Sequence, residues 1–231
     1  MSFLRPLIIL FVLVGAQASA QDEAIILETP GERSLDHRVF RAVYNYQDPV
    51  FSAAMRGVNI ASYPAFFVVV PAVGLTDWIV DGDAGAGTRM AASELATMGV
   101  VFGLKNIIRR TRPYAALSDV ERRPIGSHGP PGGIDPFSFP SGHSAIAFSL
   151  ATSASLSYPE WYVIVPAMTW ASATALARVW HGMHFPSDIV VGAVVGTGVG
   201  LLVHEIMAPD EAGQEIITPN AAPIFSFSVS F

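Results

Sequence analysis

The sequence predicts an all-α protein whose core is a bundle of about five helices. Five long apolar segments follow one another, and none alternates apolar and polar residues with the period of two that a half-buried strand requires. Hydrophobic residues make up 51% of the chain and charged residues 14%, against about 25% charged in soluble domains. Gly and Ala are abundant, which indicates closely packed helices, a membrane, or both.

The first 20 residues have the pattern of a secretory signal peptide. Arg5 precedes an apolar run, and the small residues "ASA" at 18–20 form a cleavage site after Ala20. The alternative is an uncleaved membrane helix, but the run is shorter than the roughly 20 residues that a spanning helix needs. Both interpretations imply export. The chain has no cysteine, which excludes a disulfide framework and thiolate chemistry.

After the signal peptide, residues 21–57 mix polar and apolar side chains with helical spacing. The five apolar segments then cover residues 58–76, 90–104, 144–157, 162–177 and 189–207. Pro64 and Pro71 predict kinks in the first of these segments. We therefore divide the chain into a signal peptide (1–20), an N-terminal helical segment (21–57), a functional helical domain (58–207) and a C-terminal tail (208–231). The last residues of the tail alternate like one short strand.

Gly192, Gly196 and Gly200 recur every four residues and therefore share one face of the last helix. This face permits close approach of a neighbouring backbone. Residues 109–139 are rich in Gly and Pro and predict a long ordered loop or a mobile lip. Two arrangements fit the apolar segments. In the first, all five cross a membrane, and the 105–143 and 178–188 loops lie on one side of it. In the second, they form a soluble periplasmic domain.

The net charge of −6 argues against a nucleic-acid partner. Six of the 13 basic residues nevertheless fall between 105 and 123, which indicates a small anionic ligand. They are Lys105, Arg109, Arg110, Arg112, Arg122 and Arg123.

Three short clusters contain groups capable of chemistry. In "KNIIRRTRP", Lys105 and Arg112 are seven residues apart, so they project from one helix face, although a solvated basic helix end would look the same. "PSGH" at 140–143 predicts the first turn of a helix, whose unpaired N–H groups can bind an anion, although such helix starts are also common without function.

The third cluster is "ARVWHGMHFPSD" at 177–188. His184 precedes Asp188 by four residues, so the carboxylate can accept a hydrogen bond from one imidazole nitrogen and make the other a better nucleophile. A competing interpretation treats His181, His184 and Asp188 as metal ligands, but Arg178 and Pro186 are poor neighbours for a cation. Together the clusters supply cations, a helix N-terminus and two histidines, which is the inventory of phosphoryl transfer.

The order Lys105-x6-Arg112-Pro113, Pro140-Ser141-Gly142-His143 and Arg178-x5-His184-x3-Asp188 resembles the three-part signature of the type 2 phosphatidic acid phosphatase (PAP2) superfamily. That superfamily also includes bacterial class A acid phosphatases and vanadium haloperoxidases. All three parts match in order and spacing, over about residues 58–207. One departure is Ala177, where the family usually has Ser, which removes a possible hydrogen bond but no charge.

The resemblance implies a PAP2-like bundle and a role for each matching residue. His184 would be the nucleophile that forms a phosphohistidine, Asp188 would orient it, and His143 would protonate the leaving oxygen. The groups that bind the phosphate would be Lys105, Arg112, Ser141, Gly142 through its backbone N–H, and Arg178. No metal or other cofactor is implied. Six further residues match no signature position and are interpreted as rim or surface groups: Arg109, Arg110, Arg122, Arg123, His128 and His181.

The function expected from these features is metal-independent hydrolysis of a lipid phosphate or diphosphate, of the phosphatidate or polyprenyl diphosphate type. The enzyme would lie in the inner membrane with its active site facing the periplasm. The first alternative is a soluble periplasmic non-specific acid phosphatase. Less favoured alternatives are a vanadium haloperoxidase, for which the chain is short, and a non-catalytic protein that binds anionic lipids, which would not need both histidines. The sequence does not indicate an oligomeric state.

Overall fold

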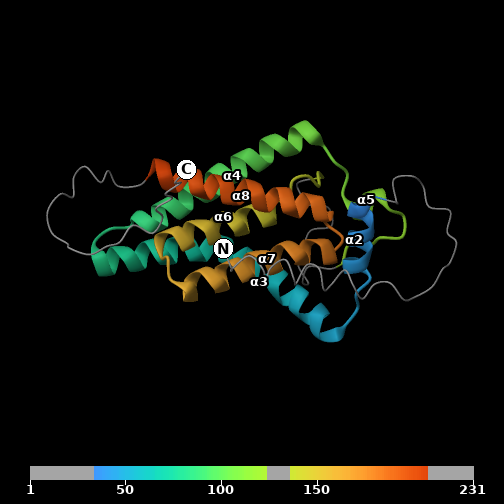
Figure 1. Cartoon of the computed structure of the whole chain (residues 1–231), viewed down its shortest axis with the longest axis horizontal. Coiled ribbons are helices and arrows are strands. Elements are labelled where there is room, and N and C mark those ends of the chain that lie inside the picture. The colour runs from blue at the N-terminus through green and yellow to red at the C-terminus, as the bar shows by residue number, and fades with distance from the viewer. Residues whose placement is uncertain (1–33, 124–135, 208–231) are drawn as a thin grey trace, which may run out of the picture.

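The computed structural model describes residues 34–123 and 136–207, and within these ranges it is helical without a β-strand. Five helices form the core and lie side by side along the long axis of the molecule (Figure 1). They are α3 (Pro49–Asp81), α4 (Gly85–Ile108), α6 (Gly142–Ser157), α7 (Trp161–Trp180) and α8 (Pro186–Ile206). The predicted all-α class and the bundle of about five core helices are confirmed.

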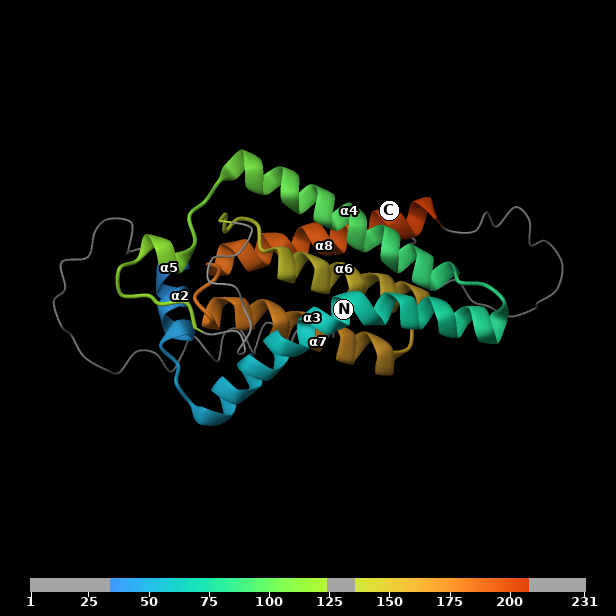
Figure 2. The same cartoon turned by 180° about the vertical axis from the view of Figure 1, so that it is seen from behind.

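Two shorter helices, α2 (Leu35–Tyr44) and α5 (Pro113–Ala116), lie together at one end of the bundle in both views (Figures 1 and 2). Phe40 of α2 is fully buried, and it joins Val120 and Phe185 in a hydrophobic cluster at that end. Because this cluster ties α2 to the segment just before α8, the N-terminal helix is part of the packed structure.

Helix α6 is the central helix and packs against α4, α7 and α8. Its buried positions are small or hydroxyl-bearing, with Leu150 as the largest of them. The predicted glycine face of α8 lies directly against it. A Cβ atom added at Gly196 would stand 1.9 Å from the carbonyl oxygen of Ala145, and one at Gly192 would stand 2.6 Å from that of Ser141. The two backbones therefore touch because α8 has no side chains on this face.

Four of the described helices are long and apolar enough to cross a membrane: α3, α4, α7 and α8. Their outward faces carry exposed large apolar side chains such as Phe67, Phe102 and Val194. The expectation of five spans fails at α6, which has 16 residues where a span needs about 20. This helix is instead enclosed by its longer neighbours.

Several helix boundaries differ from the prediction. Helix α3 begins at Pro49, with Asp48 as its N-cap, and so crosses the predicted division between residues 57 and 58. It continues through Pro64 and Pro71 and bends along its length (Figures 1 and 2). Pro140 precedes helix α6 rather than lying in its first turn, because the Ser141 side chain accepts the N–H of Ser144 and makes Ser141 the N-cap.

Other predictions fall outside the described residues. These are the signal peptide, the strand-like end of the tail, the central part of the Gly- and Pro-rich loop, and His128. The proposed division of the chain into segments likewise remains a prediction.

The contact between α6 and α8 generates a paired prediction. Gly196→Ala should destabilise the protein by about 1–3 kcal/mol, since the new methyl group must push two packed backbones apart. Gly198→Ala is the matched control, because a Cβ there meets nothing within 4 Å on the same helix. Thermal unfolding in detergent measures both. A melting temperature for Gly196→Ala equal to that of Gly198→Ala would contradict this packing.

Candidate active site

The three sequence clusters meet at one end of the bundle, where α4 ends, α6 begins and α7 connects to α8 (Figures 1 and 2). Backbone hydrogen bonds join them. The N–H of Ser138 donates to the carbonyl of Arg110 at 2.7 Å, and the N–H of Ser141 donates to the carbonyl of Asp188 at 3.0 Å. The segment before α6 is therefore held between the end of α4 and the start of α8.

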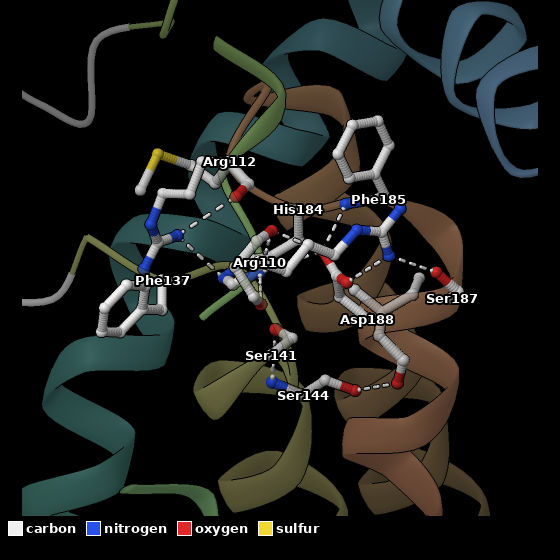
Figure 3. Close-up of polar contacts among 12 residues, drawn as sticks. Arg110, Arg112, Phe137, Ser141, Ser144, His184, Phe185, Ser187 and Asp188 are labelled. Atoms are coloured by element: carbon white, nitrogen blue, oxygen red, sulfur yellow. Dashed lines mark hydrogen bonds and ion pairs between the residues drawn. The ribbon is translucent and has the colours of Figure 1, made fainter. Parts of the chain in front are cut away.

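His184 lies in the connection between α7 and α8 and is 2% exposed. Its Nδ1 is 2.7 Å from the carbonyl oxygen of Ser138, and its Nε2 is 3.1 Å from a guanidinium nitrogen of Arg112 (Figure 3). A carbonyl can only accept and a guanidinium can only donate, so Nδ1 carries the proton and Nε2 presents its lone pair. The surroundings thus select the tautomer in which Nε2 has the free lone pair.

The predicted hydrogen bond between His184 and Asp188 is not made, because Nδ1 and Oδ2 are 3.7 Å apart. The Ser138 carbonyl takes the place that the carboxylate was expected to fill. Asp188 is fully buried, and its Oδ2 accepts from the Ser138 hydroxyl and from the backbone N–H of Phe185 at 2.8 Å. Ser138 therefore contacts both the carboxylate and the imidazole.

Arg110 was expected at the rim or surface, and that expectation is wrong. Its guanidinium is partly buried and donates to Oδ1 of Asp188 at 2.7 Å (Figure 3). The neighbouring Arg109 is exposed, as expected. Helix α4 ends at Ile108, and Arg109 is its C-cap, in the left-handed region at φ 52°. This turn redirects the chain toward the site. His181 is also not a surface group, being 1% exposed.

The three predicted phosphate-binding cations are all buried. Lys105 donates to the carbonyl of Phe137 at 2.6 Å, and Arg112 donates to that of Met183 at 3.1 Å. Arg178 donates to the side-chain oxygen of Asn59 on α3. All three cations act electrostatically on His184, so the structure brings them together around the imidazole as the signature implied.

His143 is the second residue of α6 and lies against α3, with its ring centroid 4.9 Å from that of Tyr63 and 5.5 Å from that of Phe66. Arg178 and His184 are close enough to interact with it electrostatically. Within the described part of the chain, the buried nitrogens that have no hydrogen-bond partner include Nε2 of His143, Nε of Arg178 and Nδ2 of Asn59. Such atoms are the ones that a polar ligand would satisfy.

Ser141 and Gly142 occupy the helix start that was expected to hold an anion. The Ser141 hydroxyl accepts from Ser144 as the N-cap, and its own hydrogen remains to be donated. The N–H of Gly142 belongs to the first turn of α6, where no preceding turn supplies an acceptor. That these two groups bind a phosphate remains a prediction.

The alternative metal site finds no support in the arrangement of the donor atoms. The Nε2 of His184 faces the cationic Arg112, and both oxygens of Asp188 already accept hydrogen bonds. Across residues 34–123 and 136–207, no three His, Cys, Asp or Glu side chains are grouped so that they could hold a metal ion. Independence from metal remains a prediction about activity.

Two residues of the site were missed in the sequence. Ser138 contributes both a carbonyl to His184 and a hydroxyl to Asp188, but it lies just outside "PSGH" and no spacing distinguishes it. Asn59 is fully buried and holds Arg178 from α3, which contains none of the three clusters. A buried Asn in an apolar helix was the available signal, since such a side chain needs a polar partner.

Comparison with known proteins places the chain in a family. The model of the PAP2 superfamily matches residues 86–211, which include all three clusters. The chain belongs to the PAP2 superfamily. The match leaves α2 and all of α3 outside it.

Curated relatives in the PAP2 superfamily are similar over part of their length. A decaprenylphosphoryl-5-phosphoribose phosphatase from Mycobacterium tuberculosis is 32% identical over 133 residues, covering 56% of this chain and 61% of that protein. A lipid A 1-phosphatase from Porphyromonas gingivalis is 41% identical over 75 residues, covering 31% of this chain and 17% of that protein. The chain therefore spans less than two thirds of the length of either relative.

The fold is similar to the crystal structure of a transmembrane PAP2 type phosphatidylglycerolphosphate phosphatase from Bacillus subtilis. The TM-score is 0.61 at 22% identity, over 87% of this chain and 94% of that chain. At this identity the likeness concerns the fold. Together with the four long apolar helices, it supports a membrane protein.

The environment of His184 predicts its protonation. Burial, together with the positive charges of Arg112, Arg178 and Lys105, lowers the pKa of His184 well below its ordinary value of about 6.5. The neutral imidazole therefore persists as the pH falls below about 6.5. In the unfolded chain the same histidine takes up a proton there, so this group reduces stability as the pH falls.

Nuclear magnetic resonance of histidine labelled with ¹⁵N tests this expectation. The His184 signal, assigned by its loss in His184→Gln, should keep the neutral Nδ1–H pattern at about pH 5.5, one unit below the ordinary pKa. A signal that titrates with a midpoint near 6.5 would contradict the electrostatic description of the site.

Proposed function

We propose that the protein is a metal-independent phosphatase that hydrolyses a lipid phosphate or diphosphate through a phosphohistidine on His184. The observation that carries the proposal is the orientation of that imidazole. Its Nε2 lone pair faces Arg112, which is one of three buried cations that act on the ring. The other ring nitrogen, Nδ1, donates to the carbonyl of Ser138. A nucleophile surrounded by cations is suited to a substrate that brings negative charge.

In the first step, Nε2 of His184 attacks phosphorus, and the bond between phosphorus and the leaving oxygen breaks. His143, in its protonated form, gives its proton to that oxygen, so the leaving group departs as an alcohol or a phosphate. Lys105, Arg112 and Arg178 stabilise the charge on the phosphoryl oxygens, with Ser141 and the N–H of Gly142 as further donors.

In the second step, a water molecule attacks the phosphohistidine. His143, now neutral, removes a proton from that water, and the bond between phosphorus and Nε2 breaks. Inorganic phosphate leaves, and His184 returns to the neutral tautomer held by the Ser138 carbonyl. The three buried nitrogens without partners, described above, support a polar ligand at this place.

A lipid substrate is supported by the position of the site. The cations lie at the ends of apolar helices whose outward faces are rich in exposed hydrophobic side chains. A headgroup phosphate could reach the site while its hydrocarbon chain stays beside the bundle. The relatives named above act on lipid-linked phosphates by their names, which agrees with this class.

We further propose that the active-site end faces the periplasm of the inner membrane. The chain has no native cysteine, so single introduced cysteines can report this orientation. Ser118 is exposed at the active-site end, and Asp83 is exposed between α3 and α4 at the opposite end. A membrane-impermeant maleimide applied to intact cells should label Ser118→Cys and leave Asp83→Cys unlabelled.

The covalent intermediate is the first prediction from this function. Rapid quench with ³²P-labelled substrate should trap label on the wild type, including in excess chelator, and none on His184→Ala. His143→Ala should still be labelled by activated aryl phosphates, because their leaving groups need little protonation. Vanadate, which mimics the pentacoordinate transition state, should block labelling. Full labelling of His184→Ala, or activity that returns only with a divalent metal, would contradict the mechanism.

The substrate class is the second prediction. In mixed micelles, kcat/KM for phosphatidate or a polyprenyl diphosphate should exceed that for a short soluble phosphate ester by about tenfold or more, equivalent to about 1.4 kcal/mol. His184→Ala provides the blank. Equal turnover of soluble esters, with release of the protein from membranes in an alkaline wash, would instead identify a soluble acid phosphatase. Halide oxidation in the presence of vanadate would identify a haloperoxidase.

A further inference from the structure

One carboxylate that contacts residues of the site belongs to a part of the chain outside the match to the superfamily. Asp36 is the second residue of α2, far before residue 86, where the match to the superfamily begins. Its Oδ2 accepts from the guanidinium of Arg110 at 2.6 Å, and the same guanidinium donates to Asp188 at 2.7 Å. Arg110 therefore bridges two carboxylates, one on α2 and one in the first turn of α8.

Asp36 also holds the first turn of α8 directly. Its Oδ1 accepts the backbone N–H of Ser187 at 2.8 Å, and its Oδ2 accepts the Ser187 hydroxyl at 2.6 Å. The N–H groups of a first helical turn have no acceptor within their own helix, so Asp36 supplies one from another helix. Arg110 completes the arrangement by donating to the Ser187 hydroxyl at 2.6 Å (Figure 3).

Apolar contacts fix the direction from which α2 approaches. The guanidinium of Arg110 lies 4.2 Å from the ring centroid of Phe185, and the rings of His37 and Phe40 contact Phe185 at 5.0 and 5.4 Å. Phe185 directly follows His184 in the chain, and its N–H donates to Asp188. The packing of α2 therefore affects Phe185 and Asp188, and the orientation of the His184 imidazole depends on both residues.

We propose that Asp36 and Arg110 are positioning residues, which hold Asp188 and, through Ser138, keep His184 in its reactive orientation. The sequence of contacts runs from Asp36 to Arg110, from Arg110 to Asp188, from Asp188 to the Ser138 hydroxyl, and from the Ser138 carbonyl to Nδ1 of His184. This inference rests on the proposed function of His184. It makes α2 a part of the active site, although it lies outside the three signature clusters.

The test compares two ion pairs that α2 makes with other parts of the chain. Asp36→Asn removes the charge that faces Arg110, and Asp119→Asn removes the partner of Arg41, an exposed pair that involves no site residue. Asp36→Asn should lower kcat about tenfold with KM changed less than about twofold, because the nucleophile is misplaced while the phosphate-binding cations remain. Asp119→Asn should leave both parameters within about twofold of the wild type.

A second comparison uses the adjacent arginines. Arg110→Gln should lower kcat at least as much as Asp36→Asn, and the double variant should be no slower than Arg110→Gln alone, since both act through one chain of contacts. Arg109→Gln, at an exposed position, should resemble the wild type. Independent, multiplicative losses in the double variant would overturn the proposal.

The resonance of His184 Nδ1–H gives a readout that does not depend on turnover. It should shift in Asp36→Asn and stay in place in Asp119→Asn. A wild type that hydrolyses no phosphate would refute the proposed function, whereas the resonance would still test the contacts. If the wild type is active and Asp36→Asn changes neither kcat nor the His184 resonance, the positioning role of Asp36 and Arg110 is overturned while the proposed function stands. If Asp36→Asn does not fold, Asp36→Glu, which keeps the charge one methylene further out, should give the same shift and a smaller loss of kcat.

Discussion

A carboxylate without solvent contact lies in the first turn of α8, and donors from three separate chain segments converge on it. They are the Arg110 guanidinium, the Ser138 hydroxyl and the N–H of Phe185. A buried charge is tolerated only where such partners replace water, so Asp188 draws the end of α4, the segment before α6 and the start of α8 to one point. The position of His184 follows from this convergence, because the same segments carry its two ring partners.

The surrounding charge has the opposite sign. Lys105, Arg112 and Arg178 are each 6% exposed or less, at the end of a bundle with an apolar exterior. Their fields keep the imidazole of His184 neutral, and the burial of His181, together with Arg178, lowers its pKa to about 4 in the same way. The site thus holds permanent cations beside the neutral imidazoles of His184 and His181. It is arranged before any ligand arrives, which reduces the reorganisation that a charged transition state would require.

The sequence was sufficient for the fold class and for the meeting of the side chains of the three clusters, and insufficient for the residues that hold them in place. Helical periodicity and the glycine spacing of α8 are patterns of side chains, and such patterns are visible directly in the sequence. The acceptor of His184 is a main-chain carbonyl, and any residue at position 138 would supply one. Arg109 and Arg110 have the same side chain, and only the turn at the end of α4 determines that Arg109 is exposed while Arg110 contacts Asp188. Asn59 and Asp36 reach the site across long stretches of chain, so no local spacing could reveal them.

The short α6 also bears on how the protein is made. A helix of 16 residues with serines and threonines at its buried positions is a weak candidate for independent insertion from the translocon. Two of its hydroxyl groups find partners on adjacent helices, in the bond from Thr97 to Ser149 and that from Ser144 to the carbonyl of Ile189. Helix α6 therefore depends on α4 and α8 for these contacts. Because His143 lies in the first turn of this helix, the part of α6 nearest the site gains its contact with Ile189 only once α8 has been synthesised.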